Sequence, residues 1–122
     1  NDSSYLSTSA QSGHRKPYFR VRFNAIAQAA LTDSGRLLVG SAFPDGSIIV
    51  KELYDAQGGP ISLLAVIEKS PGSTLSGDGW LWGEYYADGT PGTSVTRKGN
   101  GCTNCHSAIG SRDDVRLFEL FP

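Results

Sequence analysis

Both cysteines of this 122-residue chain lie within one five-residue segment, Cys102-Thr-Asn-Cys105-His106, which also contains one of the two histidines. Cysteines at this spacing serve a zinc site, a redox-active dithiol, a short disulfide or the covalent attachment of haem. In each alternative the fold has to place this one segment so that its side chains can reach a metal ion, a second thiol or a haem. The motif therefore constrains the fold more than any other part of the sequence.

Zinc, dithiol and disulfide chemistry fit this chain poorly. A structural zinc site takes four ligands, and beyond the motif the chain offers only His14 and carboxylates. A thioredoxin-like pair begins a helix after a strand in a βαβ unit, whereas a glycine-rich loop leads into this motif. A disulfide between Cys102 and Cys105 would close too short a loop to constrain the unfolded chain, and it would leave His106 without a role.

Haem attachment accounts for all three side chains at once. Two thiols separated by two residues each add to a vinyl group of the porphyrin, and the adjacent histidine binds the iron as axial ligand. We therefore predict one covalently attached haem c, with Cys102, Cys105 and His106 as cofactor-binding residues and His106 as the metal ligand. Such attachment is normally made outside the cytoplasm, so we expect a periplasmic or otherwise exported protein.

The ligand on the other side of the iron decides the function. Small helical electron carriers use a methionine there and begin with the haem motif, whereas this chain has no methionine and carries the motif near its C-terminus. His14 lies in the polar, basic segment GHRKP and is either a solvent-facing residue or the sixth ligand. If no residue closes that side, the iron is open to small diatomic or nitrogenous molecules.

Charge and composition bound the partners. The net charge is −1 and 39% of the residues are hydrophobic, so neither nucleic acid nor an anionic membrane surface is expected to bind. No apolar run approaches the roughly 20 residues of a membrane span. The start of the chain is polar and serine-rich and lacks signal-peptide regions, as a processed N-terminus would. We predict a flexible tail over 1–16 and one domain over 17–122.

The apolar pattern predicts an α+β fold, a mainly antiparallel β-sheet with a short N-terminal helix and a short helix at the haem-attachment motif. Apolar residues recur at helical spacing from Phe23 to Leu31. After them the period changes to two, which is typical of strands. The predicted strands are 36–43 and 47–54, which form a hairpin around Pro44-Asp45-Gly46, then 61–69, 79–87 and a terminal strand over 115–122. The second helix is expected over 102–108.

One predicted strand concentrates aromatic side chains. On an alternating strand, Trp80, Trp82, Glu84 and Tyr86 share one face. The tryptophans belong either to the hydrophobic core or to the wall of a flat aromatic cofactor site.

Three blocks of the sequence, FPDGSIIVKELY, GWLWGEYYADG and GCTNCHSAIGSRDDVRLFEL, resemble in order and spacing the cytochrome P-460 family, whose relatives include the beta-type c-prime cytochromes. The resemblance extends from about Phe19 to the end of the chain. It implies an antiparallel β fold, a c-type haem on the late motif and a five-coordinate iron. Members named for the family oxidise hydroxylamine and carry a lysine bonded to the porphyrin edge. The beta-type relatives lack this bond, have phenylalanines over the distal face and bind nitric oxide or carbon monoxide.

The resemblance makes Lys51, in IIVKELY, the candidate for the cross-linking lysine. On an alternating strand Lys51 shares a face with Ile49 and Leu53, so the alternatives are a lysine whose ammonium reaches water from an apolar face, or an edge-strand lysine. Chemistry on a nitrogenous ligand also needs a group that moves protons. Glu84 is our candidate, with pairing to a surface cation as the alternative. Lys51 and Glu84 are therefore the candidate catalytic residues.

We expect an exported mono-haem cytochrome that binds, or carries out redox chemistry on, a small nitrogenous ligand such as hydroxylamine or nitric oxide. Turnover requires a redox partner protein, because one haem holds one electron at a time. The alternatives are a gas-binding protein and an electron carrier whose sixth ligand is His14, a lysine or the N-terminal amine. The sequence is also compatible with a homodimer.

Overall fold

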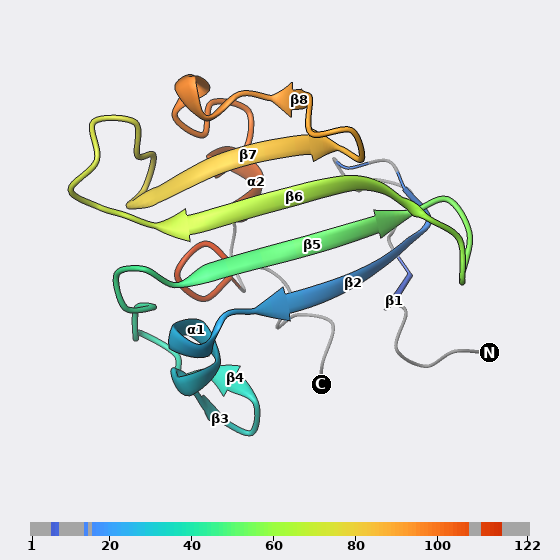
Figure 1. Cartoon of the computed structure of the whole chain (residues 1–122). Coiled ribbons are helices and arrows are strands. Elements are labelled where there is room, and N and C mark those ends of the chain that lie inside the picture. The colour runs from blue at the N-terminus through green and yellow to red at the C-terminus, as the bar shows by residue number, and fades with distance from the viewer. Residues whose placement is uncertain (1–5, 8–13, 15, 108–110, 116–122) are drawn as a thin grey trace.

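The computed structural model describes residues 6–7, 14, 16–107 and 111–115, and an antiparallel sheet with the order β1-β2-β5-β6-β7-β8 forms its centre (Figure 1). The strands of this sheet are β1 (Leu6–Ser7), β2 (Tyr18–Phe23), β5 (Ile48–Tyr54), β6 (Ile61–Lys69), β7 (Trp80–Tyr86) and β8 (Pro91–Thr93). The remaining elements are α1 (Ala25–Ala29), β3 (Leu31–Asp33), β4 (Arg36–Leu37), the 3-10 helix η1 (Val95–Arg97) and α2 (Thr103–His106). The predicted α+β class is confirmed.

The central strands β5, β6 and β7 follow their sequence patterns closely. β6 spans the residues predicted for it, and β7 differs from its prediction by one residue at each end. Both strands are rich in β-branched or aromatic side chains, which pack well on a pleated sheet. The turn at Asp88-Gly89 that follows β7 places Gly89 at a φ of +87°, a conformation that favours glycine. These strands form the middle of the sheet and position the rest.

The short helix α1 is tied to the start of β5 by one side chain. Asn24 is the N-cap, and its Oδ1 accepts from the backbone N–H of Ala27 at 3.0 Å, as N-cap side chains do. The same oxygen accepts from the N–H of Ile48 at 3.0 Å, while Nδ2 donates to the carbonyl of Gly46 at 2.9 Å. α1 is shorter than predicted, because Leu31 already belongs to β3.

The predicted hairpin of 36–43 with 47–54 is wrong. Pro44 and Ser47 do close a turn, with the Ser47 N–H donating to the Pro44 carbonyl at 3.1 Å, but this turn leads from a loop into β5. β4 instead pairs back with β3 through Ser34 and Gly35, which have φ of 53° and 82° and so form a tight hairpin turn. Both edges of β5 are taken by β2 and β6. The pattern missed β2 as a strand.

The hydrophobic core lies on one face of the sheet, which we call the inner face. One cluster of buried residues on it comprises Ala27, Leu37, Phe43, Ile49, Trp80, Trp82 and Val115. Another comprises Phe19, Leu53 and Leu63. Phe43 is 2% exposed and packs edge-on against Trp80 and stacked on Phe23, so these phenylalanines are core residues. In Figure 1, α2 and the red segment 111–115 lie behind the sheet, on this inner side.

Other predictions fall partly outside the described residues. The helix expected over 102–108 is confirmed at α2. Residue 108 lies outside the described residues, and so do residues 116–122 of the expected terminal strand. Within the predicted tail, β1 pairs Leu6 with Phe19 and Ser7 with Tyr18. The flexibility of that tail stays a prediction. No helix among the described residues is both long and apolar enough to cross a bilayer.

Replacing Leu53 by alanine should lower the free energy of unfolding by about 2–5 kcal/mol, because a fully buried leucine leaves a cavity when truncated. Urea denaturation followed by far-UV circular dichroism measures this loss. Val39, which is 71% exposed, provides the control, and Val39→Ala should change stability by no more than about 0.5 kcal/mol. Equal effects of the two substitutions would contradict the placement of Leu53 in the core.

Candidate functional site

One transverse row of side chains crosses the inner face between the two apolar clusters. The register pairs Val21 with Lys51, Lys51 with Ala65, Ala65 with Glu84, and Glu84 with Thr93. Directly paired residues point to the same face, and neighbouring strands are about 4.8 Å apart. The backbones of Lys51 and Glu84 are therefore roughly 10 Å apart, and on this face only the methyl group of Ala65 lies between the two side chains. The sheet brings together the two candidate catalytic residues, which are 33 positions apart in the sequence.

The cysteine motif lies over this same face. Cys102 is half-buried and packs against the cluster that contains Trp82. The ring of His106 meets the Trp82 indole edge-on, with 4.9 Å between centroids. Lys51 interacts electrostatically with Cys105, and Glu84 with Cys102. The structure thus gathers the candidate residues of the sequence analysis at one place.

A backbone carbonyl determines which nitrogen of His106 carries the proton. Nδ1 lies 2.9 Å from the carbonyl oxygen of Asp114, which can only accept, so Nδ1–H is the donor. In the neutral ring the lone pair is then on Nε2. Histidines that bind a metal ion almost always donate their other ring N–H to a carbonyl or carboxylate in this way. The neutral ring of His106 is therefore in the tautomer that an axial ligand requires.

The turn before α2 brings the motif close to the sheet through Gly99. The N–H groups of Cys102 and Thr103 donate to the Gly99 carbonyl at 2.8 and 3.0 Å. A Cβ added at Gly99 would lie 2.5 Å from Cδ1 of Trp82, closer than carbon atoms approach. The indole is itself held, because Nε1 donates to the Gly77 carbonyl at 2.8 Å. A glycine is required here for close approach as well as for its φ of +74°.

The two thiols are not joined in a disulfide, and their environments differ. Cys105 is exposed, whereas Cys102 is partly buried. Burial raises the pKa of the Cys102 thiol, and the nearby Glu84 carboxylate raises it further. Cys102 is therefore a protonated thiol at neutral pH, and it does not have the lowered pKa of a reactive dithiol.

Lys51 is a half-buried lysine on the inner face. Its Nζ lies 4.2 Å from the centroid of the Phe19 ring, a cation–π contact. Burial lowers the pKa of Lys51 to about 8, although Cys105 and Glu84 act in the opposite direction. β5 is an interior strand, which rules out the edge-strand alternative. Lys51 is thus neutral in an appreciable fraction of molecules near pH 8 and then carries a nucleophilic amine.

Glu84 is held in its ionised form. Nδ1 of His14 lies 3.3 Å from Oε2, and the Thr93 hydroxyl donates to Oε1 at 3.1 Å. The hydrogen bond from His14 lowers the pKa of Glu84 more than the other favourable contacts, and Thr93 and Lys51 contribute in the same direction against the effect of burial. The carboxylate is therefore an acceptor at neutral pH. Its partner is a histidine of the site.

His14 belongs to this site, so the alternative of a solvent-facing histidine is wrong. Its side chain is only 20% exposed, and its ring centroid lies 6.4 Å from that of His106, with the planes at 74°. The segment GHRKP contains no pattern that reports this burial, because the contact with Glu84 spans 70 positions of the chain. Sequence reasoning also missed Thr93 and the carbonyl of Asp114. Every residue has a backbone carbonyl, so the sequence does not indicate which one accepts a hydrogen bond from His106.

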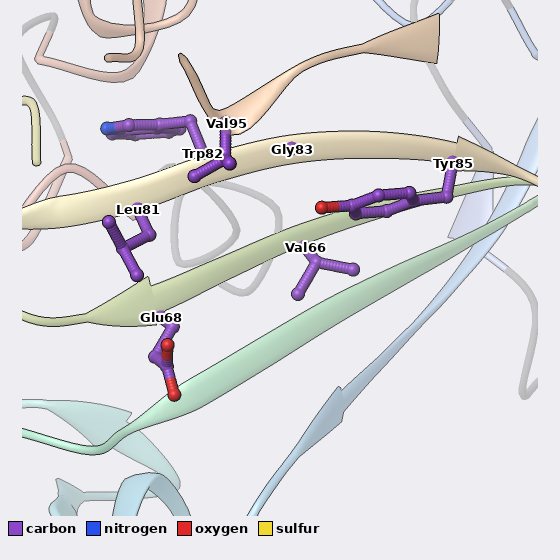
Figure 2. Close-up of a pocket in the computed structure, with 7 residues that line it drawn as sticks. All are labelled: Val66, Glu68, Leu81, Trp82, Gly83, Tyr85 and Val95. Carbon is purple, nitrogen blue, oxygen red and sulfur yellow. The ribbon is translucent and has the colours of Figure 1, made fainter. Parts of the chain in front are cut away.

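The opposite face of the sheet carries an open groove of about 250 Å³, drawn in Figure 2. Its lining comprises Val66, Glu68, Leu81, Trp82, Gly83, Tyr85 and Val95. Val66 and Gly83 alternate with Ala65 and Glu84 along β6 and β7, so they point away from the inner face. Most of the groove therefore lies on the other side of the sheet from the candidate site, and Trp82 is the residue that the two share.

Gly99→Ala should destabilise the protein more than Gly101→Ala. Both glycines have positive φ, +74° and +87°, and an alanine there costs about 1–3 kcal/mol through backbone strain. Only Gly99 has neighbours within 4 Å of the added methyl, so its substitution should cost a further 1–3 kcal/mol or so. Thermal unfolding with tryptophan fluorescence measures both. Equal losses would show that the motif does not depend on the approach of Gly99 to Trp82.

Comparison with known proteins assigns the chain to a family. The family model for cytochrome P-460 matches residues 1–116 of the 122. No curated protein matches the chain. The match includes every candidate residue described above.

Proposed function

Because the chain belongs to the cytochrome P-460 family and is a haem protein of that family, we propose that it carries one haem c bonded to Cys102 and Cys105, with His106 as the axial ligand. Its iron binds, or carries out redox chemistry on, a small nitrogenous ligand such as hydroxylamine or nitric oxide. The observation that carries this proposal is that the motif packs over the face of the sheet that holds Lys51 and Glu84, with His14 in contact with Glu84 and beside His106.

The residues present fit a haem. Two thiols that are not joined to each other lie in one helical turn, and the adjacent His106 has its lone pair on Nε2. The apolar side chains of Phe19, Leu53 and Leu63 border the row that contains Lys51, so the surroundings of the row are apolar, as those of a porphyrin are. When bound, haem supplies an iron that takes a small ligand and exchanges one electron at a time.

Glu84 and His14 receive the protons in this proposal. Oxidation of an N–H ligand releases protons, and a group that accepts them must be ionised and within reach of the ligand. Glu84 has a lowered pKa, and His14 lies 3.3 Å from it, so a proton accepted by one passes to the other along an existing contact. Electrons leave to an external acceptor, which is why turnover needs a redox partner protein.

Lys51 has two roles open to it in the same proposal. As a neutral amine it would supply the nitrogen for a bond to the porphyrin edge, in which one N–C bond would replace an N–H and a C–H bond and an external oxidant would take up two electrons. As a cation it interacts favourably with Glu84. With the bond the protein is a hydroxylamine-oxidising cytochrome, and without it a binder of nitric oxide or carbon monoxide.

A second candidate function, electron transfer, is favoured by the position of His14. Two imidazoles on opposite sides of one metal ion, each at a metal–nitrogen distance of about 2 Å, have centroids roughly 6 Å apart. The rings of His14 and His106 are 6.4 Å apart, and the Nδ1 atom of His14 faces a carboxylate, as in histidines that bind metals. With His14 as sixth ligand the iron would be closed to small molecules.

We also propose that the protein is exported, as covalent attachment of haem implies, and that its partners are the small ligand and a redox protein. The net charge of −1 gives no general attraction for nucleic acid.

Carbon monoxide should change the absorption spectrum of the dithionite-reduced protein, because an open ferrous iron binds it. The measurement is a titration of purified holoprotein with the gas, after the pyridine haemochrome spectrum has established covalent haem. His14→Ala tests the second candidate. If the iron is low-spin and does not bind carbon monoxide in the original chain, but binds it in the variant, the first proposal is wrong and the protein is an electron carrier.

Intact mass under denaturing conditions tests the bond to Lys51. If it forms, the holoprotein should weigh two hydrogens less than the apoprotein plus haem, because each new N–C bond removes one hydrogen from each partner. Lys51→Met should restore the full mass and an ordinary c-type spectrum. Lys16→Met is the control, since Lys16 pairs with Asp55 away from the row, and it should leave mass deficit and spectrum unchanged. A full mass in the original chain would exclude the cross-link.

A further inference from the structure

A two-residue turn supplies the carbonyl that holds His106. Arg112 and Val115 exchange both backbone hydrogen bonds at 3.0 Å, and between them Asp113 and Asp114 have φ of 50° and 61°. Positive φ at both central residues characterises the tightest hairpin turns, and aspartate tolerates it better than most residues. The carbonyl of the second of these residues accepts the hydrogen bond from Nδ1 of His106.

The first residue of the turn is held by buried contacts on several sides. Nζ of Lys69 lies 2.8 and 2.9 Å from the two carboxylate oxygens of Asp113. The Phe43 N–H donates to Oδ2 at 2.8 Å, and Nε1 of Trp80 donates to the Asp113 carbonyl at 3.1 Å. The side chains of Lys69 and Asp113 are only 10% and 13% exposed. Asp113 thus has little freedom to move relative to the core.

Lys69 connects this turn to the framework of the sheet. It is the last residue of β6, and its backbone forms hydrogen bonds of 2.8 Å with Gly46 and Ser47. Its Nζ also lies 5.0 Å from the centroid of the Trp80 ring. A buried ion pair is weak evidence for a role in stability, because apolar residues of similar size often serve as well. The pair instead fixes the position of Asp113 in the turn. The carbonyl of the next residue, Asp114, contacts His106.

We propose that Lys69 and Asp113 are positioning residues for the axial histidine. The pair holds the turn so that the Asp114 carbonyl stays on Nδ1 of His106, and in this way it sets how strongly the imidazole donates electrons to the iron. This inference deepens the proposed function and rests on the attachment of haem at His106. Both residues are proposed to act on His106 through the turn.

The proposal predicts a change in the midpoint potential of the haem. A hydrogen bond from Nδ1–H makes the imidazole a more basic ligand, and a more basic ligand stabilises ferric over ferrous iron. Loosening the turn should therefore raise the potential. Removing only one charge would shift the potential electrostatically as well, so the informative variant is Lys69→Met/Asp113→Asn, which leaves the net charge of the pair unchanged and keeps an acceptor for the Phe43 N–H.

The experiment is spectroelectrochemical titration of the holoproteins, with covalent haem quantified by the pyridine haemochrome spectrum. A higher midpoint potential in the double variant, with haem still attached, is the expected result. A lower potential, which greater solvent exposure of the haem would produce, or an unchanged one would overturn the proposal. If the double variant does not retain haem, Lys69→Gln/Asp113→Asn replaces it, because these amides can form one neutral hydrogen bond. This variant should show a smaller rise in midpoint potential, and a lower or unchanged potential would again overturn the proposal.

The control exchanges another ion pair in the same charge-conserving way. Lys16 and Asp55 form a contact of 3.1 Å in which the aspartate is 70% exposed, and Lys16→Met/Asp55→Asn should leave the potential unchanged. An equal rise in this variant would overturn the assignment to Lys69 and Asp113. Absence of covalent haem from the original chain would instead disprove the proposed function itself, so the two failures are distinguishable.

Discussion

The register between β5, β6 and β7 is the constraint on which the candidate site depends. It places Lys51 and Glu84 on the inner face with Ala65 between them. A slip of one residue in β5 or β7 would turn its charged side chain to the outer face and replace it with a neighbour on the strand. The apolar clusters on either side of the row oppose such a slip, because Leu53 and Trp82 would leave the core together with the charged residues.

Burial of charge then determines the chemistry of the site. Lys51 loses solvation on the inner face, so its pKa falls to about 8, whereas Glu84 keeps its charge through contacts with His14 and Thr93. These opposite responses to one environment place a partly neutral amine and an ionised carboxylate within the same row. The ion pair of Lys69 with Asp113 is buried near the carbonyl that holds His106, and it links the C-terminal turn to the sheet.

Patterns that depend on neighbouring residues predicted the middle of the fold well. β6 and β7 were predicted to within one residue, because alternation and β-branched or aromatic side chains report a strand locally. The hairpin of 36–43 with 47–54 was wrong because a turn at Pro44 does not specify which strands pair. β5 pairs with β2, whose start lies 30 positions earlier in the chain. The position of His14 was missed for a similar reason, since nothing near it in the sequence reports its contact with Glu84.

The sequence by itself determined which chemistry we propose for the cofactor, since Cys102, Cys105 and His106 lie within one five-residue segment and their spacing is typical of haem attachment. Alternation also indicated that Lys51 and Glu84 each point to an apolar face. Only the tertiary structure decided that these faces are the same one, that His14 lies beside it, and that the Asp114 carbonyl holds His106. The physical reason is that a strand pattern records which side of a strand is buried, whereas strand pairing and a backbone carbonyl depend on residues far away in the chain.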